Sequence, residues 1–349
     1  MAVEEQQAPL AEREAAPPTR GVHRAWPAVR GLLIGRPETG ALFGAVVMFA
    51  FFSIWADNFL TRTTLAGMTN IAAELGIVAM AITLLMISGH FDLSVGSVLG
   101  LSSMLVPYMM VNYDYPSYLA FAVALAVALS IGFLNGLVVV TMRIPSFIVT
   151  LGALLVWRGV LLVVSKGFPV NVPQEDPLFD VFSHRFTSGP FAQFRVATFW
   201  FIAMVIVLSF LLLRTRFGNW IFASGGNERS ARSMGVPVDR VWIILFLMTA
   251  AAACLTGLIQ VGRFNTVEAT RGQLLELQVI AAAVVGGARL NGGYGSILGT
   301  ALGAFMVAMI QVGPILGGVQ SYWLNVFYGG LIILAVVANQ LLGRSRPQI

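Results

Sequence analysis

The C-terminal part of the chain runs from Leu290 to Gly343 without a single Asp, Glu, Lys or Arg residue. A soluble domain carries roughly 25% charged residues, whereas a bilayer requires about 20 apolar residues for each helix that crosses it. The whole chain of 349 residues is 57% hydrophobic and 11% charged, with a mean hydropathy of +0.82. The sequence therefore predicts a polytopic membrane protein.

The predicted fold class is an all-α transmembrane bundle of about ten spans. We expect these spans at roughly 40–56, 70–89, 93–112, 117–140, 144–165, 197–213, 241–262, 272–288, 295–313 and 321–342. Four Gly-x-x-x-Gly pairs allow close helix packing: Gly96/Gly100, Gly132/Gly136, Gly299/Gly303 and Gly313/Gly317.

Arginines gather before the first span and in the loop between the sixth and seventh spans. Because basic residues concentrate in cytoplasmic loops, we expect both termini to be cytoplasmic. The expected organisation is a disordered cytoplasmic tail at 1–36, a transmembrane domain at 37–343 and a short cytoplasmic tail at 344–349. Within that domain, 166–196 is expected to form a periplasmic loop and 214–240 a cytoplasmic loop.

Two glycine-rich segments, Ser88–Gly100 and Gly287–Gly299, match each other across the chain and interrupt the apolar pattern. Such repeated breaks indicate a transporter built from internal repeats. The alignment pairs Asp92 with Asn291, and each is expected to cap the helix that follows it. Broken helices need protein or a watery cavity to satisfy their backbone, so the breaks are either packed turns or part of a translocation path.

Three acids lie within or beside the spans. Glu74 and Glu276 are near the outer starts of their spans, where an acid suits a helix N-terminus, and intramembrane acids such as these and Asp92 are also functional candidates. Arg158 is expected either to be buried or to snorkel to the outer interface. Cys254 is the sole cysteine, which excludes an intrachain disulfide and a cysteine zinc cluster.

The long cytoplasmic loop contains a short predicted helix, capped by Asn227 and ended near Gly235. This helix is either a docking element for a soluble partner or an ordinary charged connector. The only lysine, Lys166, follows Ser165, so the chain lacks a Walker phosphate loop. We expect no catalytic residue and no metal site. His90 is expected either to pack in place or to confer pH sensitivity.

These motifs together resemble the membrane permease subunit of bacterial carbohydrate-uptake ABC transporters, the class that handles ribose, xylose, galactosides and autoinducer-2. The resemblance covers roughly 40–343. It is carried by Gly89–Ser97, by Ile144–Gly152 with Arg158-Gly159, by Gly225–Gly235 and by Ala283–Gly299. His90 departs from the family pattern, because relatives often carry a small or aliphatic residue there.

The resemblance implies a multi-pass protein of the bacterial inner membrane that translocates a monosaccharide or related polyol by alternating access. The implied partners are a cytoplasmic ABC ATPase, which would bind ATP and Mg, a periplasmic sugar-binding protein and a second permease copy or paralogue. The chain would contact membrane lipid and its sugar substrate, but no nucleic acid. It would have no ATPase site of its own and would bind no cofactor itself.

Two sets of functional residues are expected. The ATPase-coupling set is Gly225, Gly226, Asn227, Glu228, Arg229, Ala231, Arg232 and Gly235. Sugars require uncharged polar and aromatic contacts, and the candidates for the translocation path or its gate are Asn70, Asp92, Ser94, Ser97, Asn135, Ser146, Phe147, Thr150, Gln278 and Asn291.

Two other classes of protein remain open from the residues alone. An ion-coupled secondary transporter would depend on Glu74, Asp92 or Glu276 as its ionisable group. A membrane-embedded enzyme would need a nucleophile and base or a metal cluster, and the sequence shows no such constellation.

Overall fold

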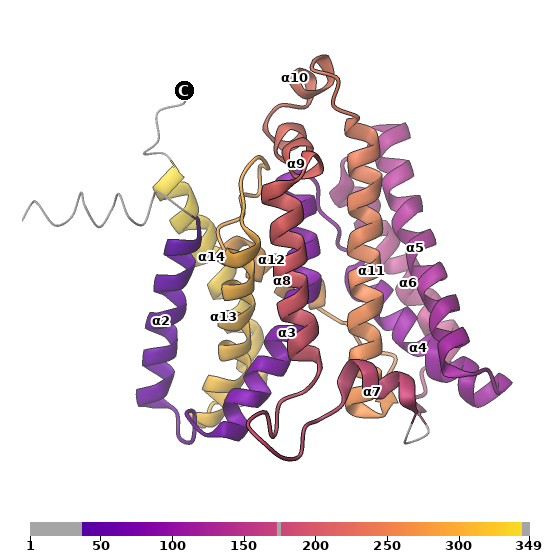
Figure 1. The fold of residues 1–349 in the computed structure, drawn as a ribbon, viewed down its shortest axis with the longest axis vertical. Coiled ribbons are helices and arrows are strands. Elements are labelled where there is room, and N and C mark those ends of the chain that lie inside the picture. The colour runs from indigo at the N-terminus through magenta and orange to yellow at the C-terminus, as the bar shows by residue number, and fades with distance from the viewer. Residues whose placement is uncertain (1–36, 173–175, 344–349) are drawn as a thin grey trace, which may run out of the picture.

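The computed structural model describes residues 37–172 and 176–343, and the predicted tails at 1–36 and 344–349 lie outside them. Apart from two short strands, the described elements are helices (Figure 1). They are α2 (Pro37–Trp55), α3 (Arg62–Ile87), α4 (Val95–Tyr113), α5 (Ser117–Met142), α6 (Ser146–Ser165), β1 (Val170–Asn171), α7 (Pro177–Ser183), α8 (Ala197–Arg214), α9 (Arg216–Gly226), α10 (Glu228–Ser233), α11 (Val238–Phe264), β2 (Thr266–Val267), α12 (Leu275–Val285), α13 (Ile297–Leu316), η1 (Ser321–Trp323) and α14 (Leu324–Gly343).

Eight of the described helices are long and apolar enough to cross a membrane. Two of the ten predicted segments, 272–288 and 321–342, instead hold shorter apolar helices, at Leu275–Val285 and Ser321–Leu334. The prediction of a polytopic helical bundle is therefore confirmed, with eight spans by length and hydropathy.

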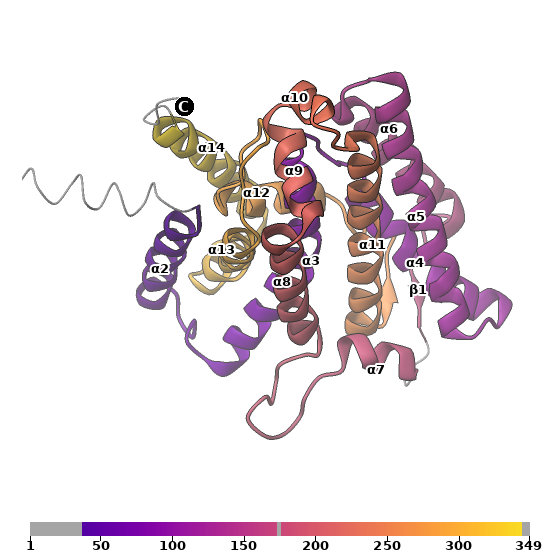
Figure 2. The ribbon, with the colours of Figure 1, turned by 45° about the horizontal axis from the view of Figure 1, so that its top comes forward.

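α3 lies at the centre of the bundle. In Figures 1 and 2, α2, α13 and α14 lie to one side of α3 and α8, while α11, α5, α4 and α6 lie to the other. The start of α2 and the end of α14 both point toward the end of the bundle that carries α10, and α7 lies at the opposite end. We call these the α10 end and the α7 end.

Small residues explain how so many helices reach the central one. Gly76 of α3 faces Phe201 of α8 and Ala304 of α13, and a Cβ there would overlap the phenyl ring. Close approach of backbones through Gly and Ala is how helices associate where lipid removes the usual hydrophobic drive between them. In the most apolar 18-residue stretch of α3, 94% is buried within this one chain, against 11% in the corresponding stretch of α6. α3 is therefore enclosed by protein.

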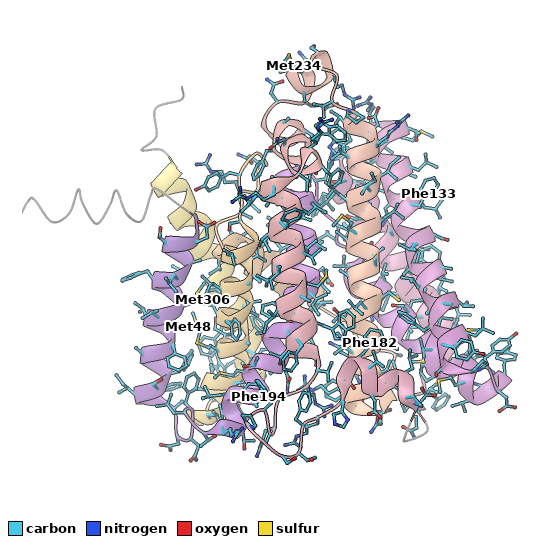
Figure 3. The ribbon with its side chains drawn as sticks, in the orientation of Figure 1. Met48, Phe133, Phe182, Phe194, Met234 and Met306 are labelled. Carbon is cyan, nitrogen blue, oxygen red and sulfur yellow. The ribbon has the colours of Figure 1, made fainter. Side chains whose placement is uncertain are left out.

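The predicted Gly-x-x-x-Gly contacts are confirmed as packing sites. Gly132 and Gly136 of α5 face Phe246 and Ile243 of α11, and Gly313 of α13 faces the ring of Phe52 on α2. The outer faces instead present large apolar side chains, such as Phe133 on α5 (Figure 3). Such faces are stable against lipid acyl chains rather than water.

The described part of the predicted periplasmic loop at 166–196 pairs with a distant loop. β1 pairs antiparallel with β2, with Val170 opposite Val267. Asp176 caps α7 by accepting the N–H of Leu178 at 2.8 Å, and Ser117 donates its hydroxyl to the same carboxylate at 2.7 Å. The α7 end is thereby closed by a loop that contacts α4, α8 and α11.

We predict that Gly132→Ala lowers the stability of the bundle by about 1–3 kcal/mol, the typical effect of overpacking. A Cβ there would lie 2.6 Å from the carbonyl oxygen of Phe246 and 2.8 Å from the Cβ of Ala250. The matched control is Gly152→Ala, which has no atom within 4 Å of the added carbon. Thermal unfolding of the purified protein in detergent measures both, and equal melting temperatures for the two variants would contradict this account of the α5–α11 contact.

Candidate functional site

The predicted coupling residues lie at the α10 end, in two short helices that follow α8. We call residues 216–235 the coupling segment. Asn227 ends α9 and begins α10, because its extended backbone stops the first helix while its side chain accepts the N–H of Ser230 at 3.0 Å. The predicted cap is therefore confirmed. The helix ends at Ser233, and Gly235 supplies the positive φ of +80° that turns the chain toward α11.

Ion pairs attach α10 to two long helices. Arg232 donates to Glu228 at 2.9 Å and to Asp239, at the start of α11, at 3.0 Å. Arg143, at the end of α5, donates to Glu228 at 3.0 Å. The hydrogen bond to Asp239 raises the pKa of the Arg232 guanidinium above its usual value. Because four charges share this network, α10 is held to both α5 and α11 more firmly than a single exposed pair would hold it.

The other side of α10 is available for contact. Ala231 is buried against the bundle, whereas Arg229, Ser230 and Ser233 are exposed. Met234 is 84% exposed and stands at the tip of the α10 end, beyond the long helices (Figure 3). Methionine and arginine are each enriched at protein interfaces, and α10 and its end expose both.

His90 lies beneath the coupling segment. Its ring meets Trp242 edge-on, with 4.1 Å between ring centroids. Arg232 also lies over the Trp242 ring, 5.6 Å from its centroid. Burial lowers the pKa of His90 to about 4, although the nearby Glu228 carboxylate acts in the opposite direction. The histidine is therefore neutral and packed at neutral pH.

A buried polar network surrounds the first break. One oxygen of Asp92 accepts the backbone N–H of Ser94 at 2.9 Å and the hydroxyl of Ser94 at 2.6 Å. The other accepts the hydroxyl of Thr249 on α11 at 2.7 Å, and Asn135 of α5 donates to the Ser94 hydroxyl oxygen at 2.9 Å. Thr249 lies about 16 Å along α11 from its start at Val238. The network therefore reaches well into the bundle.

Asp92 thus stabilises the turn before α4, but Ser94 is the N-cap residue and the helix begins at Val95. The sequence missed Thr249, because a single threonine in an apolar run carries no pattern of its own. Its role depends on an aspartate 157 positions earlier in the chain.

The same break is joined to α6. The N–H of Phe91 donates to the hydroxyl oxygen of Ser146 at 3.0 Å. Thr150 donates to the carbonyl of Ser146 at 2.8 Å, and Ser97 of α4 donates to the carbonyl of Leu154 at 2.8 Å. Six of the ten path candidates therefore lie together around the first break, each with a protein partner: Asp92, Ser94, Ser97, Asn135, Ser146 and Thr150.

The other four candidates take no part in this hydrogen-bond network. Phe147 is exposed on α6, and Asn291 is exposed in the second break. Asn70 is buried on α3, about 25 Å along the helix from Ile87 at the first break. Gln278 of α12 accepts an N–H bond from Gln311 of α13 at 3.2 Å.

The second break corrects two expectations. Asn291 does not cap α13; Ser296 does, by accepting the N–H of Gly299 at 3.3 Å. The structural equivalent of Gly89 is Gly287. Their φ values are +92° and +93°, and each N–H donates to the carbonyl three residues earlier, which belongs to the next-to-last residue of the preceding helix. The sequence alignment, which paired Ser88 with Gly287, is therefore shifted by one residue at this point.

The membrane acids and Arg158 have defined surroundings. Glu74 forms an ion pair with Arg263 of α11 at 2.7 Å and accepts a bond from Gln260 at 3.3 Å. Arg158 donates to the carbonyl of Arg271 at 2.7 Å, so it holds the loop before α12 and does not simply snorkel. Glu276 is buried at the start of α12.

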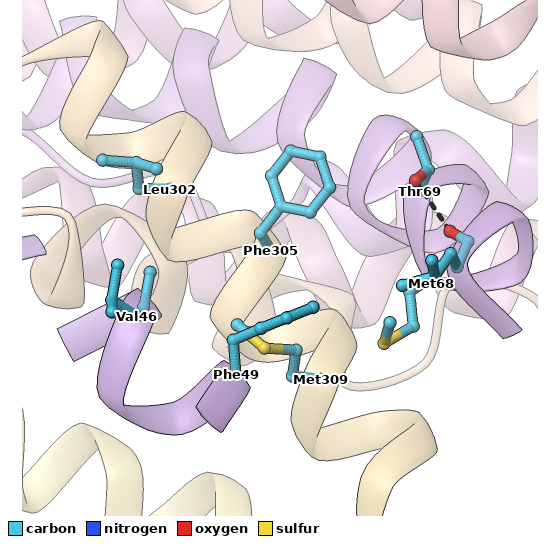
Figure 4. Close-up of a pocket in the computed structure, with 9 residues that line it drawn as sticks. Val46, Phe49, Met68, Thr69, Leu302, Phe305 and Met309 are labelled. Atoms are coloured by element: carbon cyan, nitrogen blue, oxygen red, sulfur yellow. Dashed lines mark hydrogen bonds between the residues drawn. The ribbon is translucent and has the colours of Figure 1, made fainter. Parts of the chain in front are cut away.

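A pocket of about 280 Å³ lies between α2, α3 and α13 (Figure 4). Its lining is apolar except for Thr69, whose hydroxyl is already donated to the carbonyl of Leu65 at 2.7 Å. A sugar placed there would leave its hydroxyl groups without partners, which is strongly unfavourable. This pocket suits a lipid acyl chain better than a polar substrate.

A family model described as the permease component of branched-chain amino acid transport systems matches residues 64–336. The ribose import permease protein RbsC of Escherichia coli K12 is 34% identical over 306 residues, covering 86% of this chain and 93% of the relative. The chain belongs to this permease family. It is an integral protein of the inner membrane, and the matched region of the permease runs from α3 into α14, so α2 lies outside it.

Two further relatives of this permease carry the same kind of description. RbsC of Bacillus subtilis strain 168 is 32% identical over 303 residues, which cover 87% of this chain and 92% of the relative. The autoinducer 2 import system permease protein LsrC of Escherichia coli is 31% identical over 306 residues, with 86% and 85% covered. No solved structure matches the chain significantly.

Acidification is predicted to destabilise the permease through His90. The unfolded histidine, with a pKa of 6.5, binds a proton before the folded one, whose pKa is about 4. Stability is therefore full above about pH 6.5 and is lost as the pH falls toward 4. Between about pH 7.5 and pH 5, the melting temperature in detergent should fall more for the wild type than for His90→Phe. Equal pH dependence in the two proteins would contradict this role.

Proposed function

We propose that this chain is the transmembrane subunit of an ABC importer that moves a monosaccharide or related polyol into the cell. The observation that carries the proposal is α10, a short helix with one exposed face and with side-chain ion pairs that join it to α5 and α11. Relatives named as ribose and autoinducer 2 import permeases support the substrate class.

In this proposal the energy comes from another chain. The sequence has one lysine and no phosphate-binding loop, so a cytoplasmic ABC ATPase would bind ATP and Mg and would dock on α10. A periplasmic binding protein would deliver the sugar to the α7 end. A second permease copy or paralogue would complete the pathway, with both termini of this chain on the ATPase side.

The geometry of α10 gives the mechanism its first step. A displacement of α10 by the ATPase would act directly on α5 and α11, because Arg143 and Asp239 belong to the ends of those helices. α11 also carries Thr249, which is bonded to the first break through Asp92. The proposed alternation between outward- and inward-facing states is thus a rearrangement of packed helices with two stable positions.

Around the first break the proposed path offers uncharged polar groups beside Asp92, with Ser94, Asn135, Ser146 and Thr150 as candidate contacts. In the described structure these groups bond to one another and to the backbone. We propose that the sugar replaces some of these bonds when the helices separate. Exchange of one hydrogen bond for another keeps the buried polar groups satisfied throughout transport.

The coupling proposal predicts the effect of changing the α10 tip. Met234→Asp should greatly reduce recovery of an ABC ATPase when the tagged permease is purified from its native membrane, because an interface anchor becomes a solvated charge. The control is Phe168→Asp, which changes a residue of 70% exposure beyond the far end of α6. Mass spectrometry of co-purified proteins measures both, and a wild type recovered without an ATPase would overturn the proposed function.

Substitutions at Asp92 distinguish the hypothesis of an ATP-driven importer from that of an ion-coupled transporter. Asp92→Asn should retain uptake within about threefold, because its amide can donate to Thr249, which in turn donates to the carbonyl of Phe246 at 2.9 Å. Asp92→Ala should lose uptake and stability, since it leaves the Ser94 N–H unpaired. The ion-coupled class is correct if two results are found together. Uptake into proteoliposomes requires an ion gradient but no ATPase, and Asp92→Asn abolishes that uptake as completely as Asp92→Ala.

A further inference from the structure

The backbone at the end of α9 contacts both helix breaks directly, with no side chain between them. Gly225 packs against the carbonyl of Ile87, the last residue of α3, so closely that a Cβ at Gly225 would overlap that oxygen. The same carbon would lie 2.9 Å from the backbone nitrogen of Gly293 in the second break. The coupling segment thus contacts the first and second breaks at a single residue.

The two breaks are also bonded to each other at this point. The N–H of Gly293 donates to the carbonyl of Ile87 at 2.8 Å. A Cβ on Gly292 would lie 3.0 Å from both the carbonyl oxygen of Gly225 and the Cα of Gly89. Gly292 and Gly293 have φ values of +78° and +72°, which side chains disfavour. Three segments from distant parts of the sequence therefore join without intervening side chains.

We propose that this glycine junction, formed by Gly225, Ile87 and Gly293, transmits the movement of the coupling segment to both repeat breaks at once. The inference rests on the proposed function and adds the residues that carry the motion. Side chains between moving helices can absorb a displacement by changing rotamer. Backbone in direct contact has no such freedom, so a shift of α9 displaces the ends of α3 and of the second break together.

The breaks then pass the movement to two further helices. The first break leads into α4, whose start is tied to α5 and α11 through Ser94 and Asp92. The second leads into α13, which is capped by Ser296. Thr83 of α3 and Thr300 of α13 are hydrogen-bonded at 2.7 Å, so these two helices also share a buried polar contact beyond the junction.

The neighbouring glycine offers a matched control. A Cβ at Gly226 would have no atom within 4 Å, and Gly226 is exposed. An alanine methyl group at Gly225 would therefore enter the breaks, whereas one at Gly226 would not, although the Gly226 backbone also lies near Gly293. Both substitutions place an alanine in the last turn of α9, so their effects on helix propensity have the same direction.

The experiment compares these variants in the assembled importer reconstituted in proteoliposomes, with ATP hydrolysis and sugar uptake measured together. Gly225→Ala should keep the ATPase bound and hydrolysing, while uptake per ATP falls by about tenfold or more because the added carbon separates the segments. Gly226→Ala should remain within about twofold of wild type. Equal uptake per ATP for the two variants would overturn the junction, whereas a wild type without ATP-driven uptake would overturn the proposed function.

A second measurement covers the case in which Gly225→Ala does not fold. Gly226→Cys and Asn291→Cys, both at exposed positions, are combined with Cys254→Ser to remove the native thiol. A short bifunctional maleimide then links the coupling segment to the second break. If the junction moves as one body, the linked importer retains ATP-driven uptake within about twofold of the unlinked one. Loss of uptake on linking would show that the segments separate during transport, and would overturn the proposal.

Discussion

Where a helix is interrupted among apolar surroundings, its backbone N–H and C=O groups lose their helical partners and have no water to bond. The arrangement of the whole bundle depends on which protein groups bond them at the two breaks. At the first break, the Asp92 carboxylate accepts the N–H of Ser94 and the hydroxyl of Ser146 accepts the N–H of Phe91. At the second, the N–H of Gly293 is satisfied by the Ile87 carbonyl. The partners of Phe91 and Gly293 come from other helices, so satisfying the breaks also determines which helices lie together.

The proposed function uses the same bonds. An importer of this family must let its helices move without exposing unpaired groups, and the polar partners around the first break are numerous enough to exchange. The coupling segment joins this arrangement in two ways: α10 by the ion pairs of Arg232, and α9 by the backbone of Gly225. The first fixes α10 to the long helices, and the second places α9 against both breaks.

Local features of the fold could be predicted from the sequence, whereas those that depend on distant partners could not. The Asn227 cap was correct because capping involves residues within one turn. The Asn291 cap was wrong because four residues, 290–293, loop out before Ser296, and nothing local marks that loop as the contact with Gly225. The ten path candidates remain predictions; the structure gathers six of them around one break and adds Thr249.

The sequence by itself determined that this chain crosses a membrane several times, where its apolar segments lie, and which motifs it shares with the permeases that it resembles. These conclusions follow from composition and short motifs, whose physical effect is exerted within a few residues or against the lipid. Only the tertiary structure decided the register of the two repeats, the enclosure of α3 and the meeting of Gly225 with both breaks. Such contacts depend on how helices far apart in the chain pack, and a glycine's role there is defined by the neighbour that it allows to approach.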